Sequence, residues 1–301
     1  MKNMNKYENC LLCPRKCGIN RAIGQTGVCG VSAEIRVARA ALHYWEEPCI
    51  SGKKGSGAVF FSGCSLHCVF CQNREISDGK AGKVISKERL SDIFIELAGK
   101  GANNINLVTP GQYIPDIVWA VNDARSRGMK LPIVYNTSGY ENVTELKLLD
   151  GIVDVYLPDF KYMDSALSAK YSRAKDYPSV AKQAISEMVR QQPGVVIDDA
   201  TGLIQKGVIV RQLLLPGHVN DAKAILKYLH DTYQDSIYIS MMSQFTPIEL
   251  KDYPEINRTV TRREYERLID YAIKIGITNA FIQEGNVAKD SFIPAFDGEG
   301  V

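Results

Sequence analysis

The stretch AVFFSGCSLHCVFCQN, residues 58–73, joins a short apolar run to a loop that carries three cysteines. The run 58–61 is typical of a buried parallel strand, and Gly63 begins the loop that follows it. Because α/β barrels carry their chemistry at the carboxyl ends of their strands, we expect this loop to lie at a functional face of the protein.

The three cysteines of this loop are suited to an iron–sulfur cluster. Cys64, Cys68 and Cys71 supply three thiolates, which leaves one iron of a 4Fe–4S cube free to bind a substrate or a cofactor. Phe70 precedes the last of them, and we expect its ring to shield the cluster from water. His67 is an alternative ligand, although a histidine on the surface of the loop is the favoured interpretation.

A second group of cysteines precedes the loop, at Cys10, Cys13, Cys17 and Cys29. All the cysteines lie in the first quarter of a chain that shows no secretion signal, so metal binding is favoured over a disulfide framework. Four thiolates complete the coordination of either a zinc ion or a second iron–sulfur cluster, and the spacing does not decide between them. Such a site is structural or relays electrons. Cys49 is assigned no role.

The composition is that of an ordinary globular protein of 301 residues, large enough for one full-sized core with a small appendage. No apolar run reaches ~18 residues and the first residues lack the apolar core of a signal peptide, so we expect a cytoplasmic protein that does not enter a membrane. A formal net charge of +2 gives no electrostatic reason to expect nucleic-acid binding.

After the cysteine loop, helical stripes of apolar residues alternate with short apolar strands. The strands are predicted at 104–108, 131–135, 153–157, 208–215, 237–241 and 280–282, with a loop over 191–206. Thr261 and Glu264 form a capping box that opens the last helix.

This alternation favours a parallel sheet with helices outside it. About six strands are too few for a closed eight-stranded barrel. We therefore predict an α/β fold, a partial (β/α)6 TIM-like barrel open on one side, with a small cysteine-rich N-terminal module. The predicted divisions are 1–50 for the cysteine-rich segment, 51–285 for the barrel and 286–301 for a C-terminal tail.

The Cys-x3-Cys-x2-Cys loop after a strand resembles the signature of the radical S-adenosylmethionine (SAM) superfamily. Its wider context is similar to the pyruvate formate-lyase activating enzyme-like branch, over roughly residues 8–285. The residues that carry the likeness are those at 13–21, 46–48, 50–52, 55–57 and 61–73. The resemblance implies an enzyme that binds SAM at the open iron of its cluster.

Polar residues just after the predicted strands, together with Arg211 within the strand predicted at 208–215, are the candidate SAM contacts. They are Thr109, Asn136, Ser138, Asp159, Lys161, Arg211 and Gln244, with His218, Gln283 and Glu284 as further strand-end residues. The resemblance implies that 159–161 helps to hold the cofactor. Residues 136–137 align with an Asp-Thr pair that also contributes to a monovalent cation site, and asparagine here removes the charge that favours a cation.

One departure from the family pattern concerns the segment after the second predicted strand. Many members of the superfamily carry Gly-Gly-Glu there, whereas this chain has VTPGQ at 108–112. Without a carboxylate in this segment, SAM binding must depend on other contacts or be weaker.

The resemblance implies a specific chemistry and leaves the substrate open. A reduced 4Fe–4S cluster cleaves SAM to methionine and a 5′-deoxyadenosyl radical, which abstracts hydrogen from a substrate. A flavodoxin or ferredoxin-type reductant is implied. The family name suggests a glycyl-radical-type protein substrate, and a small molecule, a peptide or a modified RNA stays open. No catalytic residue is identified. The alternative is a non-catalytic iron–sulfur electron carrier or redox sensor.

Overall fold

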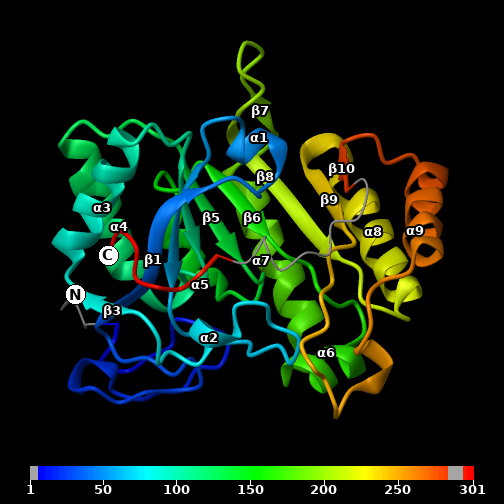
Figure 1. Cartoon of the computed structure of the whole chain (residues 1–301), viewed down its shortest axis with the longest axis horizontal. Coiled ribbons are helices and arrows are strands. Elements are labelled where there is room, and N and C mark those ends of the chain that lie inside the picture. The colour runs from blue at the N-terminus through cyan, green and yellow to red at the C-terminus, as the bar shows by residue number, and fades with distance from the viewer. Residues whose placement is uncertain (1–5, 284–293) are drawn as a thin grey trace.

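The computed structural model describes residues 6–283 and 294–301, and a single mixed sheet forms its centre (Figure 1). The strands lie in the order β10-β9-β8-β6-β5-β4-β2-β1-β3, and β7 pairs with β8 outside this path. Their bounds are β1 Ile35–His43, β2 Ser56–Phe61, β3 Lys83–Ile85, β4 Ile105–Val108, β5 Ile133–Thr137, β6 Val155–Pro158, β7 Val196–Ile197, β8 Ile204–Leu213, β9 Tyr238–Met242 and β10 Ala280–Ile282.

All neighbouring strands from β2 to β10 along this path are parallel. Strands β2, β4, β5 and β6 are buried along their whole length, as expected for a parallel sheet covered on both faces. In the part of the chain that the structure describes, the end strands β3 and β10 do not pair with each other. The predicted α/β fold with a partial, open barrel is confirmed.

The helices lie between the strands in sequence and cover the sheet. Their bounds are α1 Pro48–Ser51, α2 Arg74–Ser77, α3 Lys87–Gly99, α4 Ile114–Ser126, α5 Val143–Leu146, α6 Ser165–Ser172, α7 Tyr177–Gln191, α8 Val219–Tyr233 and α9 Arg262–Ile275, with short 3-10 turns η1 Arg21–Ile23, η2 Gly111–Tyr113, η3 Lys147–Leu149, η4 Gln234–Ser236 and η5 Pro254–Ile256. The capping box predicted at Thr261 and Glu264 is present and begins α9. No helix among the described residues is long and apolar enough to cross a membrane.

The prediction of a loop over 191–206 is wrong at 196–197, which form β7, and at 204–206, where β8 begins. β7 pairs antiparallel with the first residues of β8, and the two strands form a hairpin closed by the bond from Gly202 N–H to Asp198 O (2.8 Å). A strand of two residues is too short to show an alternating pattern, so β7 could not be predicted from the sequence.

Strand β1 was not predicted, because Arg36 and Arg39 interrupt its apolar residues. It pairs antiparallel with both β2 and β3. Residues near the end of the chain also follow it, since Ala40 N–H donates to Glu299 O and Gly298 N–H donates to Ala38 O. The predicted divisions at residues 50 and 285 stay predictions.

The parallel strands end on the side of the sheet where the N-terminal segment and the loop leading to α2 lie, at the bottom of Figure 1. The cysteine loop of residues 64–71 directly follows β2 on this side. The fold therefore brings both cysteine groups to the carboxyl ends of the strands.

Candidate active site

A large cavity opens at the carboxyl ends of the parallel strands, with about 1210 Å³ of empty space. It is lined by the three cysteines of the loop and by every candidate SAM contact: Cys64, Cys68, Cys71, Thr109, Asn136, Ser138, Asp159, Lys161, Arg211 and Gln244. These residues come from six separate segments of the chain. The structure thus brings the whole predicted set together, while their roles stay predictions.

The cysteine loop begins at Gly63, which needs to be glycine. Its φ is +89°, and a Cβ there would lie 2.7 Å from Cys29 O. Ser172 Oγ, at the end of α6, donates to Cys68 Sγ in the loop (3.0 Å). Burial raises the pKa of the Cys71 thiol to about 12, so this sulfur would need a bound metal to be a thiolate near neutral pH.

Two residues of the loop have the surroundings that their sequence positions suggested. Phe70 is buried, with its ring centroid 5.6 Å from that of Phe245 and 6.4 Å from that of Tyr162. This aromatic group borders the cavity through Phe70 and keeps water from that side of the loop. The ring nitrogen Nε2 of His67 lies 2.6 Å from Val28 O, on the N-terminal segment.

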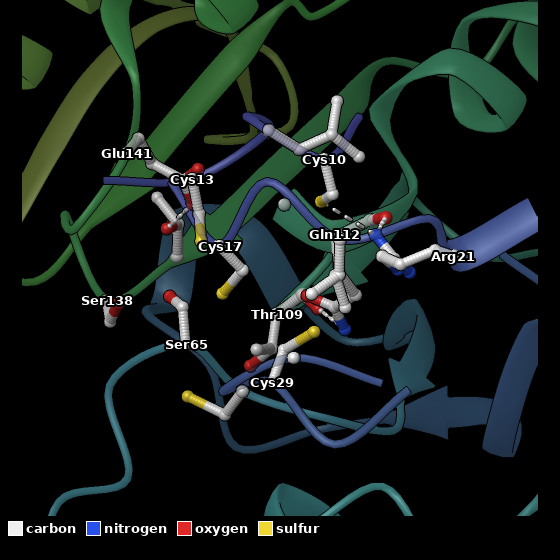
Figure 2. Close-up of a pocket in the computed structure, with 16 residues that line it drawn as sticks. Cys10, Cys13, Cys17, Arg21, Cys29, Ser65, Thr109, Gln112, Ser138 and Glu141 are labelled. Atoms are coloured by element: carbon white, nitrogen blue, oxygen red, sulfur yellow. Dashed lines mark hydrogen bonds between the residues drawn. The ribbon is translucent and has the colours of Figure 1, made fainter. Parts of the chain in front are cut away.

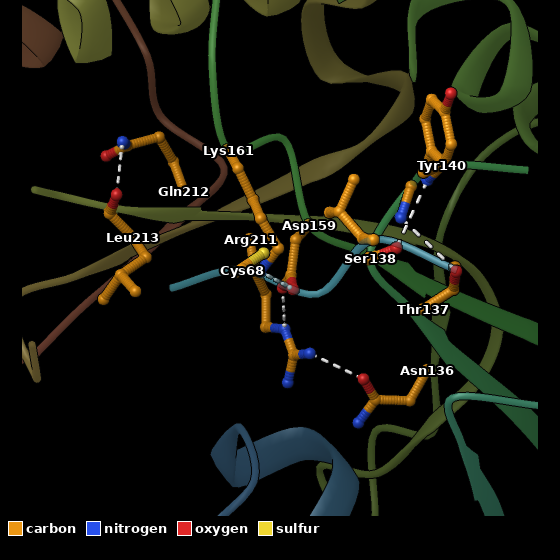
Figure 3. A network of polar contacts seen from close by, with 12 residues as sticks. Cys68, Asn136, Thr137, Ser138, Tyr140, Asp159, Lys161, Arg211, Gln212 and Leu213 are labelled. Carbon is orange, nitrogen blue, oxygen red and sulfur yellow. Dashed lines mark hydrogen bonds and ion pairs between the residues drawn. The ribbon is translucent and has the colours of Figure 1, made fainter. Parts of the chain in front are cut away.

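A network of buried charges crosses the floor of the cavity (Figure 3). The Arg211 guanidinium donates from Nε to Asp159 Oδ1 (2.9 Å), from Nη2 to Asn136 Oδ1 (2.6 Å) and from Nη1 to Glu46 Oε2 (3.2 Å). Lys161 Nζ donates to the other oxygen of Asp159, Oδ2, at 2.6 Å. The four charged side chains are only 10–19% exposed. One aspartate is thus held between two cations.

These contacts fix the charge of the aspartate. Burial by itself raises the pKa of Asp159, but the Arg211 and Lys161 cations outweigh it and hold this pKa below its ordinary value. The same contacts place a guanidinium between Asn136 and Asp159. A side-chain cation therefore lies next to Asn136, and the expectation that this chain does not favour a monovalent cation there stays a prediction.

Two carboxyl groups of the region were missed by sequence reasoning. Glu46 reaches the cavity from the segment between β1 and α1, and its only signal was its place in the 46–48 stretch of the resemblance. Glu141 is buried four residues beyond β5, where its carboxyl accepts a hydrogen bond from Thr137 Oγ1, and burial raises its pKa to about 7. Glu46 thus brings a carboxyl group to the cavity, although the 108–112 segment contains none, whereas Glu141 is not among the described residues that line it.

Thr109 adopts a backbone conformation that β-branched residues avoid, with φ at +56°. Its N–H donates to Asn136 O (2.9 Å), and its carbonyl oxygen accepts from Gln112 Nε2 (2.9 Å). Gln112 Nε2 also lies 3.0 Å from the carbonyl oxygens of Ser62 and Gly63, at the start of the cysteine loop. Strained residues held by their surroundings cluster at functional sites, which supports the assignment of Thr109 to the cofactor.

We expect Thr109→Gly to be more stable than Thr109→Ala by about 1 kcal/mol in the free energy of unfolding, because only glycine accepts this φ without strain. The glycine variant should therefore unfold at a higher temperature. Both variants are expected to bind SAM more weakly than the parent, since both lose the side chain that lines the cavity. Anaerobic thermal unfolding and equilibrium dialysis of SAM measure the two effects. An alanine variant at least as stable as the glycine variant contradicts the strain.

The remaining strand-end candidates are not equivalent. Gln244 Oε1 accepts from Gln283 Nε2 (3.0 Å), and the Gln244 carbonyl oxygen accepts from Gln72 Nε2 (3.1 Å), next to the last cysteine of the loop. His218 Nε2 instead lies 3.1 Å from Tyr171 Oη, and His218 is not among the described residues that line the cavity. Glu284 lies outside the described residues.

The other predicted metal ligands, Cys10, Cys13, Cys17 and Cys29, line a second cavity (Figure 2). It has about 540 Å³ of empty space. Cys49 is separate from both groups: it is buried in the core beside Ile50, and burial raises its pKa to about 12. It behaves as an ordinary core thiol.

Comparison with known proteins adds three findings. Residues 51–179 match the family of 4Fe–4S single cluster domains (Fer4_12). An uncharacterized protein of Methanocaldococcus jannaschii, MJ0674, is 28% identical over 280 residues, which is 91% of this chain and 77% of the relative. The structure of Streptococcus suis SuiB bound to S-adenosylmethionine superposes with a TM-score of 0.51 at 12% identity, over 74% of this chain and 48% of SuiB. SuiB bound to its precursor peptide SuiA gives 0.50 at 12% identity, over 74% and 47%.

The fold is a partial α/β barrel similar to that of SuiB, and residues 51–179, somewhat less than half of the chain, are similar to 4Fe–4S cluster domains. Together with the three-cysteine loop, they support the predicted assignment of this chain to the radical SAM superfamily. The chain spans about half the length of the SuiB structures, so this similarity concerns the fold alone.

Proposed function

We propose that this chain is a radical SAM enzyme whose catalytic cluster is held by Cys64, Cys68 and Cys71. The observation that carries the proposal is that a loop with three cysteine ligands and seven candidate SAM contacts line one cavity. The residues fit both groups. Three sulfurs ligate a 4Fe–4S cube and leave one iron open, and the cavity beside them is lined by charged and polar side chains that can bind the polar groups of SAM.

When bound, the reduced cluster and SAM supply methionine and a 5′-deoxyadenosyl radical, which abstracts hydrogen from a substrate. The protein positions these groups and excludes water. Lys161 is suited to the SAM carboxylate, because an ammonium has three donors and one of them already bonds Asp159. Asn136, Ser138, Thr109 and Gln244 are suited to the ribose, adenine and ammonium groups.

Arg211 has a different role from Lys161. Its guanidinium is already engaged with Asp159, Glu46 and Asn136, so it holds these side chains in place and is a positioning residue. Glu46 and Asp159 then present carboxylate oxygens toward the cavity, where they attract the SAM ammonium.

We further propose that the enzyme belongs to the pyruvate formate-lyase activating enzyme-like branch and acts in the cytoplasm on a peptide or protein, with a glycyl-radical-type protein as the leading candidate. The residues at 46–48, 50–52 and 61–73 support the branch. SuiB, which has a similar fold, has been crystallised with a precursor peptide, which supports a polypeptide substrate. A flavodoxin or ferredoxin is the proposed reductant.

The test is cleavage of SAM by the anaerobically reconstituted enzyme with dithionite. We expect 5′-deoxyadenosine from the parent and only background from Cys68→Ala, because the cluster needs this ligand. Cys49→Ala is the matched control, since Cys49 is a buried cysteine outside both groups, and it is expected to form product at the parental rate. Equal product from the parent and Cys68→Ala would refute the proposal.

A further inference from the structure

The four N-terminal cysteines are held around one cavity by the backbone of their own segment. Cys10 N–H donates to Ile19 O (2.9 Å), Gly18 N–H donates to Cys10 O (3.0 Å) and Lys16 N–H donates to Cys13 O (3.0 Å). Figure 2 shows the four labelled cysteines distributed around a common space. The segment is therefore folded as a cradle whose lining is rich in sulfur.

The sulfurs lie spread around the cavity and do not converge on one point, which favours a cluster over a single ion. A zinc site needs four sulfurs about 2.3 Å from one point, whereas each thiolate of a 4Fe–4S cube binds a different corner. Among the described residues, no three Cys, His, Asp or Glu side chains converge closely enough to hold one metal ion. The backbone also packs against a sulfur, since a Cβ on Gly27 would lie 2.8 Å from Cys17 Sγ.

The charge of the cradle points to an anionic occupant. Arg21 is 1% exposed, and its hydrogen-bond acceptors in the described part of the chain are the carbonyl oxygens of Val31, Gln112 and Ser32, at 2.6–3.1 Å, and Cys10 Sγ at 3.8 Å. Its guanidinium also lies over the rings of Tyr7 (5.0 Å) and Tyr113 (5.6 Å). None of these partners is a carboxylate. A buried guanidinium is costly unless negative charge lies near it. The Glu141 carboxyl lines the same cavity, and a cluster with four thiolates would add negative charge next to Arg21 through Cys10.

The cradle shares a wall with the candidate active site. Cys64, Thr109, Thr137 and Ser138 line both cavities. The two cysteine loops are also bonded together: Arg15 Nε, between Cys13 and Cys17, donates to Ser65 O (2.8 Å) on the other loop. An occupant of the cradle therefore lies next to the group bound by the three-cysteine loop.

From these observations we propose that Cys10, Cys13, Cys17 and Cys29 hold a second, fully ligated 4Fe–4S cluster that exchanges electrons with the first. One electron enters the second cluster from a reduced flavodoxin or ferredoxin and leaves it for the first, and no bond or proton moves. The identity of the occupant is independent of the proposed function, whereas the electron exchange requires the first cluster to be present.

The occupant is tested in the triple variant Cys64→Ser/Cys68→Ser/Cys71→Ser, which cannot hold the first cluster. We expect it to retain about four irons and about four sulfides per chain after anaerobic reconstitution, and to give an electron paramagnetic resonance signal with dithionite. Adding Cys13→Ser and Cys17→Ser is expected to remove both. One zinc per chain, or no iron and sulfide, in the folded triple variant would overturn the proposal. Failure of SAM cleavage has no bearing on this count.

Should the triple variant not fold, the iron content of a Cys13→Ser/Cys17→Ser variant is compared with that of the parent, in which the three-cysteine loop is intact. The iron content is expected to fall from about eight to about four per chain. An iron content that stays at about four in both proteins, with zinc lost from the double variant, overturns the cluster.

The reduction potential of the second cluster tests whether the charge of Arg21 faces it, because a purely structural role of Arg21 would leave this potential unchanged. In the triple variant, Arg21→Gln is expected to lower the reduction potential of the second cluster, because the cation stabilises the more negative reduced state. Arg21→Lys keeps the charge and is expected to stay near the parental potential. Equal potentials in the Gln and Lys variants would show that this charge does not face a cluster.

The proximity of the two clusters has its own test. The spectrum of the fully reduced parent is expected to differ from the sum of the spectra of the two single-cluster variants, because nearby reduced clusters interact magnetically. A parent spectrum equal to that sum would overturn the proposed electron exchange.

Discussion

Arg211→Met is expected to lower the unfolding midpoint by roughly 10 °C and to abolish measurable SAM binding. The guanidinium makes three hydrogen bonds, to Asp159, Glu46 and Asn136, in a place that water hardly reaches. Its loss leaves Glu46 without this cation and removes the donor to Asn136 Oδ1, so that the Asn136 side chain keeps the weaker bond from its Nδ2 to Glu46 Oε1 (3.2 Å). Removing one partner of a buried ion pair typically costs about 3–5 kcal/mol.

The control for this variant is Arg262→Met, because Arg262 forms an ion pair with Glu266 while 93% of its side chain is exposed. Exposed pairs of this kind contribute about 0–1 kcal/mol, so its midpoint is expected to move by no more than a few degrees. An Arg211→Met protein that melts with the control and still binds SAM would contradict the positioning role.

Lys161→Met is expected to weaken SAM binding about 10–100-fold with a much smaller loss of stability than Arg211→Met. A charge-assisted hydrogen bond contributes about 1.5–3 kcal/mol, which corresponds to this range of affinity. Stability is less affected because Asp159 keeps its bond to Arg211 Nε (2.9 Å) when the lysine is removed. The separation of the two effects distinguishes a ligand contact from a positioning residue.

Equilibrium dialysis of SAM against the anaerobic protein measures this affinity. Lys227→Met is the matched control, since Lys227 is 62% exposed and paired with Asp231 on α8. It is expected to bind SAM as the parent does. A Lys161→Met protein with parental affinity would exclude the lysine as the partner of the SAM carboxylate.

The sequence predicted the parallel part of the sheet well because its strands are buried on both faces. An unbroken apolar run such as 58–61 carries a signal that does not depend on neighbouring strands. Strand β1 lacked such a signal, since arginines at 36 and 39 interrupt it, and β7 was too short to show a pattern. Strands of this kind are defined by pairing with distant residues, which a local pattern cannot reveal.

The candidate site was predictable to the extent that it follows from strand ends. Thr109, Asn136 and Asp159 were found because the carboxyl ends of parallel strands meet at one edge. Glu46 lies outside this rule, because it enters the cavity from a segment that precedes β2. The contact of the two cysteine loops was likewise hidden, since it depends on how the N-terminal segment folds back over the sheet.

The charged residues of the cavity, Arg211, Asp159 and Lys161, argue against the alternative of a non-catalytic electron carrier or redox sensor. A carrier needs bound clusters but has no use for an open iron beside a polar cavity. The network of Arg211, Asp159 and Lys161 is costly to bury, and it borders that cavity. Such a network is more readily explained by a charged ligand than by electron transfer alone.

The most direct test is the electron paramagnetic resonance spectrum of the dithionite-reduced protein before and after SAM is added, with Cys68→Ala as the control. If the open iron at Cys64, Cys68 and Cys71 binds SAM, the spectrum of the parent changes on addition and that of the variant does not. An unchanged parental spectrum at saturating SAM would contradict the account, and would favour an iron–sulfur carrier or sensor instead.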